Sequence, residues 1–216
     1  MSPTSINLPL LSPSRRDNPF ATCWTNPGAL PFRFNNDQSI EQLVEKLAAQ
    51  QWRGAIVGPH GSGKSTLLEA LKPAIVEGGR SIHAITLRNG QRSLPRRFFA
   101  TWTSDSNAVI IIDGYEQLGW SECLHLWLRC RSTRAGLLVT SHTPVRIPTL
   151  IRLSPDRQLV EQLVDDLCGE VSTTITRADI AASHACHGSN VREILFELYD
   201  RHEAGRRESN SSHAAS

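Results

Sequence analysis

The sequence predicts an α/β fold, in which a five-stranded parallel sheet forms a three-layer sandwich with helices and is followed by a small C-terminal helical lid. Short apolar runs alternate with segments of helical periodicity between residues 36 and 154, the pattern of a parallel sheet covered on both faces. Beyond residue 155 only helical patterns occur. A third observation, a glycine-rich loop between the first strand and a helix, also fits this class.

That loop lies within residues 54–71, between the apolar run Ala55–Val57 and a helix. Its glycines can adopt backbone angles that turn consecutive N–H groups into one anion-binding nest, and the helix adds its positive N-terminus. Lys64 can reach the outer phosphates of a nucleotide, and the Ser65 hydroxyl can bind Mg²⁺. The alternative is a glycine-rich turn without a ligand. The predicted nucleotide-binding residues are Gly58, Pro59, His60, Gly61, Ser62, Gly63, Lys64, Ser65 and Thr66.

Residues 1–35 contain six of the twelve prolines and little periodicity, so we expect an extended arm there. Its aromatic residues are Phe20, Trp24, Phe32 and Phe34. They have two possible roles: to cover the base of a nucleotide, or to pack on the sheet or the next helix. Ser39 then starts a helix, with Gln42 as its capping-box partner.

The remaining elements divide into an α/β domain over residues 36–154 and a helical lid over residues 155–204. We expect further strands at residues 81–87, 108–113, 136–140 and 149–153, and helices at residues 98–102, 120–131, 158–168, 177–184 and 191–202. Residues 205–216 are polar and serine-rich and are predicted to form a disordered tail.

The apolar run 108–112 ends in Asp113. An acid at the carboxyl end of a buried strand beside the phosphate loop can hold Mg²⁺, whereas a lone Asp before Gly would more often cap a turn. Because Asp113 occurs together with the loop, the metal role is preferred. The predicted metal ligands are therefore Ser65 and Asp113, and the predicted ion is Mg²⁺.

The loop GPHGSGKS and the run VIIID resemble the Walker A and Walker B motifs of P-loop ATPases. The alternation of strands and helices, the polar cluster Thr140–His142 and the C-terminal segment around Arg192 resemble the AAA+ branch over residues 38–203. This resemblance implies a P-loop NTPase fold, ATP as the nucleotide, a sensor role after the fourth strand and a sensor Arg in the lid.

The chain departs from the AAA+ pattern at one position. Gly114 stands where that family has the Glu that polarises the attacking water, and the next acid is Glu116. Arg192 falls in the first turn of the last helix, where a cation opposes the helix dipole, which favours a specific anion partner such as the γ-phosphate. The alternatives are an ion pair with Glu193 or Glu197, or plain solvent exposure. The predicted catalytic residues are Lys64, Glu116, His142 and Arg192.

The resulting hypothesis is a Mg²⁺-dependent, AAA+-like ATPase that couples its nucleotide state to a protein or nucleic-acid partner. The alternatives are a small-molecule or nucleotide kinase, in which Arg92, Arg96 and Arg97 hold an acceptor, and a nucleotide-gated regulatory module that barely hydrolyses. The same basic connection, Arg88 to Arg97, could instead contact nucleic acid or form a solvated loop. Homo-oligomerisation is also possible for this class.

Composition adds broader limits. The formal net charge of +2 is too small to indicate a polyanionic partner by itself, and 39% hydrophobic content is ordinary for a globular protein. Five cysteines without paired CxxC spacing favour reduced thiols, and no window approaches the length of a membrane span. A group of three candidate ligands, His184, Cys186 and His187, more often reflects a helix end than a metal site. We expect a cytoplasmic protein that does not bind membranes.

Overall fold

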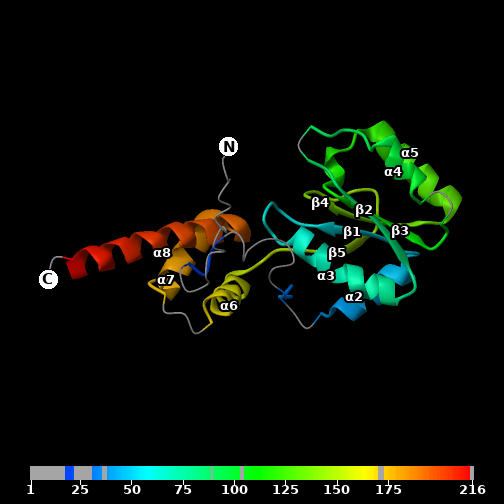
Figure 1. The fold of residues 1–216 in the computed structure, drawn as a ribbon. Helices are drawn as coiled ribbons and strands as arrows, with labels where there is room; N and C mark the ends of the chain where they lie inside the picture. Colours follow the sequence, from blue (N-terminus) through cyan, green and yellow to red (C-terminus); the bar gives the residue numbers. More distant parts are fainter. Residues whose placement is uncertain are drawn as a thin grey trace, which may run out of the picture.

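The computed structural model describes residues 18–21, 31–35, 38–88, 90–102, 105–169 and 173–214. An α/β domain is followed by three helices that lie to one side of it (Figure 1). The first half contains α2 (Ile40–Ala49), β1 (Arg53–Val57), α3 (Lys64–Glu77), β2 (Ser81–Thr86), α4 (Arg96–Ala100), β3 (Ala108–Asp113) and the 3₁₀ helix η1 (Tyr115–Gln117). The second half contains α5 (Trp120–Thr133), β4 (Gly136–Ser141), β5 (Thr149–Arg152), α6 (Arg157–Cys168), α7 (Arg177–His187) and α8 (Val191–Ala214).

The five strands form one parallel sheet in the order β2-β3-β4-β1-β5. This confirms the predicted fold class. All six residues of β4 are buried, as are the five apolar residues of β3, because helices cover both faces of the sheet. The strand order brings the carboxyl ends of β1, β3 and β4 together at one edge, where α/β folds bind ligands.

Each face of the sheet has its own apolar core. On one face α4 and α5 pack around Phe99, Trp102 and Leu126, and on the other α2 and α3 pack around Leu47 and Leu71 (Figure 1). The helix α2 begins as predicted, since the Ser39 side chain accepts the Gln42 N–H and the Gln42 side chain accepts the Ser39 N–H.

The three C-terminal helices share a separate apolar cluster, formed by residues such as Val160, Ile180 and Leu198. The last helix continues to Ala214, so the structure has helix where the sequence predicted a disordered tail. The prediction ended the helix where its apolar periodicity ends, but intrahelical hydrogen bonds do not require an apolar face.

Two short pieces of the N-terminal arm contact different parts of the molecule. Phe20 is fully buried in the helical cluster, where Asn18 also donates a hydrogen bond to Glu203 at 2.8 Å. Phe32 and Phe34 contact each other edge to face and pack against the core on the α2–α3 side. The arm therefore bridges both units, while the predictions made for Trp24 and Cys23 fall outside the residues described.

No helix among the described residues is both long and apolar enough to cross a membrane.

Candidate functional site

The loop between β1 and α3 follows the backbone conformation that the glycines allow. Gly61 has φ +68° and Gly63 has φ +88°, values that side-chain-bearing residues rarely adopt. Gly63 also serves as the N-cap of α3, so Lys64 is the first residue of that helix. The loop thus leads straight into a helix N-terminus, which carries partial positive charge.

Lys64 is almost fully buried and uses all three of its N–H bonds. Its Nζ donates to the carbonyl oxygens of Gly58 at 2.8 Å and Pro59 at 2.6 Å, and to His142 Nδ1 at 3.1 Å. Burial lowers the pKa of Lys64, while the nearby carboxylates of Glu116 and Asp113 oppose this shift. The ammonium is therefore held at the loop by three acceptors that a phosphate oxygen could replace.

His142 connects Lys64 to Glu116. Because an ammonium has no lone pair, His142 Nδ1 accepts from Lys64, which leaves the ring proton on Nε2, 3.0 Å from Glu116 Oε1. Burial lowers the pKa of His142, as do the charges of Lys64 and His60, and Glu116 opposes them. The His60 ring lies against His142, with centroids 3.4 Å apart. These contacts favour a neutral His142 with its proton on Nε2.

Asp113 accepts two hydrogen bonds at the carboxyl end of β3. Ser65 Oγ donates to Asp113 Oδ2 at 2.9 Å, and Thr140 Oγ1 donates to Oδ1 at 2.6 Å. Thr140 Oγ1 also accepts the Gly114 N–H at 2.8 Å. The two predicted metal ligands are thus in contact with each other, and Thr140 fixes the orientation of the carboxylate.

Gly114 turns the chain so that Glu116 lies beside the same site. With φ +87°, Gly114 ends β3 and caps the 3₁₀ turn Tyr115–Gln117. Glu116 Oε1 contacts His142, whereas Glu116 Oε2 is buried with no hydrogen-bond partner among the described residues. A buried carboxylate oxygen without a partner is costly, so this atom is available to accept a hydrogen bond from a ligand or water.

The helix α8 begins against the phosphate loop. Asn190 Oδ1 lies so close to Gly61 that a methyl group there would collide with it, and it also accepts the Glu193 N–H at 3.4 Å. Arg192 follows in the first turn of α8, with its side chain exposed and its charge close enough to Lys64 to lower that pKa. Two helices therefore begin at one loop and bring both predicted cations to it.

These groups line a cleft of about 770 Å³ between the α/β domain and the lid. One end is polar and includes the loop 60–66, Asp113, Glu116 and His142. The lining also includes Phe32 and Phe34 from the arm and apolar residues of α6 and α8, namely Leu159, Leu163, Val191 and Leu195, together with polar residues such as Arg33, Asn35, Gln38 and Arg152. The cleft therefore offers both anion-binding groups and apolar side chains.

The predicted acceptor arginines are not part of this cleft lining. Arg92 lines a separate hollow of about 330 Å³ beside the Glu116 turn, whereas Arg96 and Arg97 are exposed on α4. Two contacts that hold the arm at the cleft were not foreseen. Arg33 pairs with Asp166 of α6 through both guanidinium-carboxylate contacts, and Asn35 Nδ2 donates to the Ser154 carbonyl at 2.9 Å.

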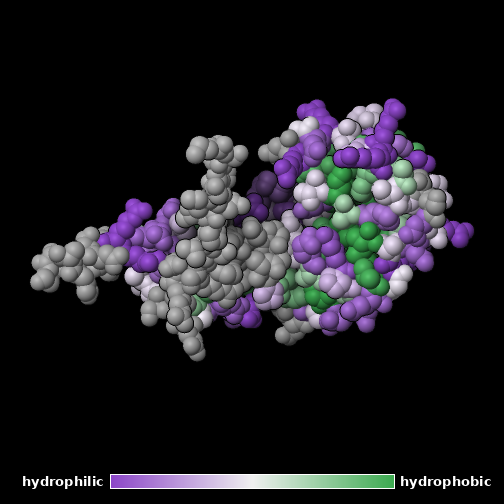
Figure 2. All heavy atoms as spheres, in the orientation of Figure 1, coloured by the Kyte–Doolittle hydropathy of each residue, from purple (hydrophilic) through white to green (hydrophobic). Residues whose placement is uncertain are grey.

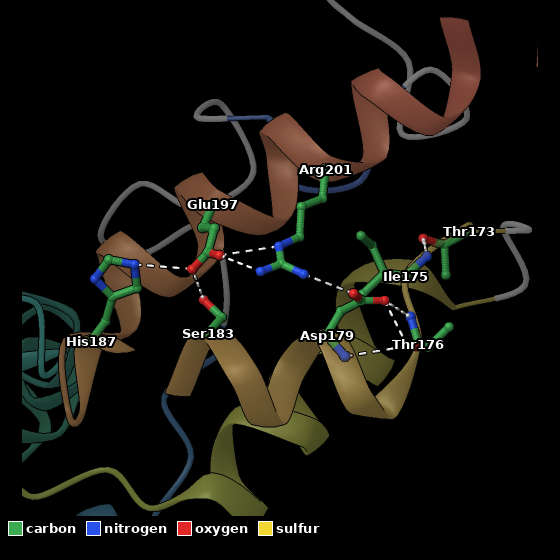
Figure 3. A network of polar contacts seen from close by, with 8 residues as sticks. All are labelled: Thr173, Ile175, Thr176, Asp179, Ser183, His187, Glu197 and Arg201. Carbon is green, nitrogen blue, oxygen red and sulfur yellow. Dashed lines mark hydrogen bonds and ion pairs between the residues drawn. The ribbon is translucent and has the colours of Figure 1, made fainter. Parts of the chain in front are cut away.

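A polar network holds α7 and α8 together (Figure 3). Glu197 of α8 accepts hydrogen bonds from Ser183 at 2.6 Å and His187 at 3.0 Å. Arg201 contacts Glu197 on its own helix and Asp179 on α7 at 2.8 Å. This network gives His187, one of the three candidate metal ligands, a carboxylate partner, and it joins α7 to the helix that carries Arg192.

Solved structures of two known proteins share this fold. One is Orc1 of Aeropyrum pernix in complex with DNA, with TM-score 0.57, 13% identity, and coverage of 83% of this chain and 62% of that one. The other is DnaA of Aquifex aeolicus bound to AMPPCP, with TM-score 0.50, 16% identity, and coverage of 78% of this chain and 65% of that one. This chain therefore spans less than two thirds of either protein.

No protein family and no curated protein matches the sequence. At these identities the structural likeness establishes the fold alone, and the fold agrees with the predicted resemblance. The chain shares with these two structures an α/β fold, in which a five-stranded parallel sheet is covered by helices on both sides.

Proposed function

We propose that this protein is a Mg²⁺-dependent ATPase whose nucleotide state controls the position of the helical lid. The observation that carries the proposal is the convergence of Lys64, Arg192 and the Ser65–Asp113 pair at the polar end of one cleft. A helix N-terminus, a loop nest and two cations suit a polyphosphate. The apolar side chains that the arm and the lid contribute to the cleft suit a base.

The site has the oxygen ligands that Mg²⁺ prefers, a hydroxyl and a carboxylate already in contact with each other. Ser65 and Asp113 would hold the ion, and Thr140 would keep the carboxylate oriented. When bound, Mg²⁺ would neutralise charge on the phosphates. The position of Asp113 at the end of a strand supports this role, because the strand fixes its backbone.

Glu116 is the proposed catalytic base. Its buried Oε2 has no partner among the described residues, so it can accept a proton from an attacking water, while His142 Nε2 holds the other oxygen. Lys64 would exchange its bond to His142 for a phosphate oxygen when ATP binds. Arg192 would contact the γ-phosphate from the first turn of α8, which links nucleotide state to lid position.

The proposal also includes a cytoplasmic location and a protein or nucleic-acid partner, as well as possible self-association. DNA is present in the Orc1 structure and a nucleotide analogue in the DnaA structure, and both support this class of function by analogy only.

Phosphate release by the wild type, Glu116→Gln and Asp113→Asn tests the proposal. We expect Glu116→Gln to keep ATP affinity but lose turnover, because a base acts only in the chemical step. Asp113→Asn should lose the Mg²⁺ dependence of binding. ATP binding without phosphate release from the wild type would instead support a regulatory module, and phosphate transfer to an added acceptor would support a kinase.

A further inference from the structure

The outer face of α5 is unusually apolar for a surface helix. Trp120 is 80% exposed, Leu124 47%, Trp127 39% and Leu128 51%. These positions fall at i, i+4, i+7 and i+8, so the four side chains form one stripe along the helix. The opposite stripe, which includes Leu126 and Cys130, is buried against the sheet. The helix is therefore apolar on two faces, and only one of them packs against other described residues.

The exposed stripe offers on the order of 400 Å² of apolar surface, judged from the size of its side chains and their exposure. The other large exposed apolar residues in the described part of the chain are Val76 on α3 and Phe196 on α8. Each stands alone on its own helix. The α5 stripe is thus a concentrated apolar patch, of the size that marks interaction sites on monomeric proteins.

The layer that carries the stripe is strongly basic. Residues 88–102 and 118–135 contain seven arginines and one acid, a formal charge of 7 − 1 = +6 in a chain whose total is +2. The acid, Glu122, already accepts the Leu94 N–H at 3.2 Å. The arginines are Arg88, Arg92, Arg96, Arg97, Arg129, Arg131 and Arg134. All seven are exposed, and none forms an ion pair with a described residue.

The basic residues and the stripe belong to one continuous surface. Gly119, directly before Trp120, donates its N–H to the Arg92 carbonyl at 3.0 Å, and the Phe99 ring of α4 stacks on His125 of α5 at 4.8 Å. In the space-filling view, hydrophilic residues lie beside hydrophobic ones in the region of α4 and α5 (Figure 2). The basic connection Arg88 to Arg97, for which the sequence analysis left three roles open, therefore lies next to the exposed stripe.

We propose that this α4–α5 surface docks an amphipathic helix of a partner protein, with leucine-like side chains on the stripe and acidic residues opposite the arginines. The spacing of the four apolar side chains matches the anchor pattern of helix recognition. The uncompensated arginines supply charge complementarity to an acidic partner. The four apolar side chains of the stripe all lie on α5 and are not part of the cleft lining.

Two other occupants fit these observations less well. Two copies of this chain meeting through their α5 stripes would bring their arginines together, and like charges at an interface are costly. Single-stranded nucleic acid would use the tryptophan rings as stacking platforms, but Arg131 already lies over Trp127 at 5.5 Å. Leu124 and Leu128, in the middle of the stripe, offer nothing to a base or a phosphate.

The probe is a labelled synthetic helix of Leu, Ala and Glu, with Leu at i, i+3, i+4 and i+7, tested by fluorescence anisotropy against the full chain. We expect it to bind at least about tenfold more tightly than a scrambled peptide of the same composition, or than a version with Lys in place of Glu. Leu124→Glu should remove the difference in affinity between the ordered acidic peptide and the control peptides. Val76→Glu, at a matched exposed site on α3, should retain that difference.

A charge swap tests the orientation of the partner. Arg131→Glu should weaken the binding of the acidic peptide and strengthen the binding of the version with Lys. Circular dichroism of Leu124→Glu and Arg131→Glu checks that both variants keep the fold. Equal affinity for the ordered and scrambled peptides would overturn the proposal. It would also be overturned if a single-stranded oligonucleotide bound in a Leu124-independent way and competed with the acidic helix, or if sedimentation showed dimers that Leu124→Glu dissociates.

Discussion

His60 and His142 are neighbouring residues of the same type whose rings are in contact but whose roles differ. Both rings line the cleft, but only His142 contacts both Lys64 and Glu116 among the described residues. Its Nδ1 accepts from the Lys64 ammonium, and its Nε2 lies against the Glu116 carboxylate. The orientation of Glu116 therefore depends on His142, while His60 contributes a ring contact.

His142→Ala should lower the rate of ATP hydrolysis by roughly tenfold or more, the effect expected when a hydrogen bond to a charged group is lost. ATP affinity should change little, because Lys64 remains able to bind phosphate. The matched control, His60→Ala, should keep most of the activity. Equal losses of turnover in the two variants, measured at saturating ATP, would mean that the bond from His142 to Glu116 has no role in the reaction.

The described cysteines differ in their expected reactivity. Burial raises the pKa of the Cys130 thiol to about 12 and that of Cys168 to about 11, whereas Cys186 is exposed. Iodoacetamide at mildly alkaline pH should therefore modify Cys186 well before the other two, since the thiolate is the reactive form. Mass spectrometry of the native protein measures this order, and rapid labelling of Cys130 without denaturant would contradict it.

The same shifts predict a loss of stability at high pH. Because the folded protein binds the Cys130 proton more tightly than the unfolded chain does, this contribution is fully present below about pH 9, the ordinary pKa. It is lost as the pH rises toward 12. Replacing Cys130 by Ser, which does not titrate there, should flatten this part of the stability profile.

At the scale of elements, the loop between β1 and α3 and the start of α8 form one contact. Gly61 permits the left-handed backbone of the loop and also leaves room for Asn190, the residue before α8. The sequence predicts each half separately, the loop from its glycines and the helix start from the segment around Asn190. Their contact could not be predicted, since it depends on how the lid sits against the sheet domain.

Gly61→Ala should have two effects: it strains the backbone of the loop, and its methyl group displaces Asn190 from its contact with the loop. Gly79→Ala is the matched control, because Gly79 also has a positive φ, +78°, but has nothing within 4 Å of an added methyl group. Both variants should lose about 1–2 kcal/mol from backbone strain. Only Gly61→Ala should also lose most of the rise in melting temperature that ATP causes. Equal ATP shifts in the two variants would argue against a direct contact between loop and lid.

Most strands and helices could be predicted from the sequence, and the reason differs among them. The apolar run that ends in Asp113 and the capping box at Ser39 are local signals, so their elements follow from neighbouring residues. Thr140 was noted only as part of a polar cluster, because its bond to Asp113 depends on β4 lying next to β3. The extension of α8 to Ala214 carries no apolar periodicity and was missed for that reason.

At the scale of the whole molecule, the N-terminal arm joins the lid to the sheet domain. Phe20 is buried among the lid helices, whereas Phe32 lines the cleft and packs on the sheet side. The ion pair between Arg33 and Asp166 connects the second piece of the arm back to α6. A movement of the lid relative to the sheet would therefore change the contacts of the arm on both sides of the cleft.

Phe20→Ala and Phe32→Ala should have separable effects. Removing Phe20 from its buried site should destabilise the lid by about 3–5 kcal/mol, as expected for a large core aromatic. Hydrogen exchange should then increase in α7 and α8 while the sheet remains protected. Phe32→Ala should instead weaken nucleotide binding with little change in lid exchange. If Phe20→Ala instead increased hydrogen exchange equally in the lid and in the sheet, the lid would not unfold separately.

Calorimetric titration of ATP into the wild type and Lys64→Ala, each with Mg²⁺ and with a chelator, measures whether the cleft binds a magnesium nucleotide. We expect that the wild type binds ATP, that Mg²⁺ tightens binding, and that Lys64→Ala weakens it by about 2–4 kcal/mol through loss of a buried charge partner. Far-ultraviolet circular dichroism confirms that the variant is folded. Failure of the wild type to bind ATP, or unchanged affinity in a folded Lys64→Ala protein, would show that the cleft is not an ATP site.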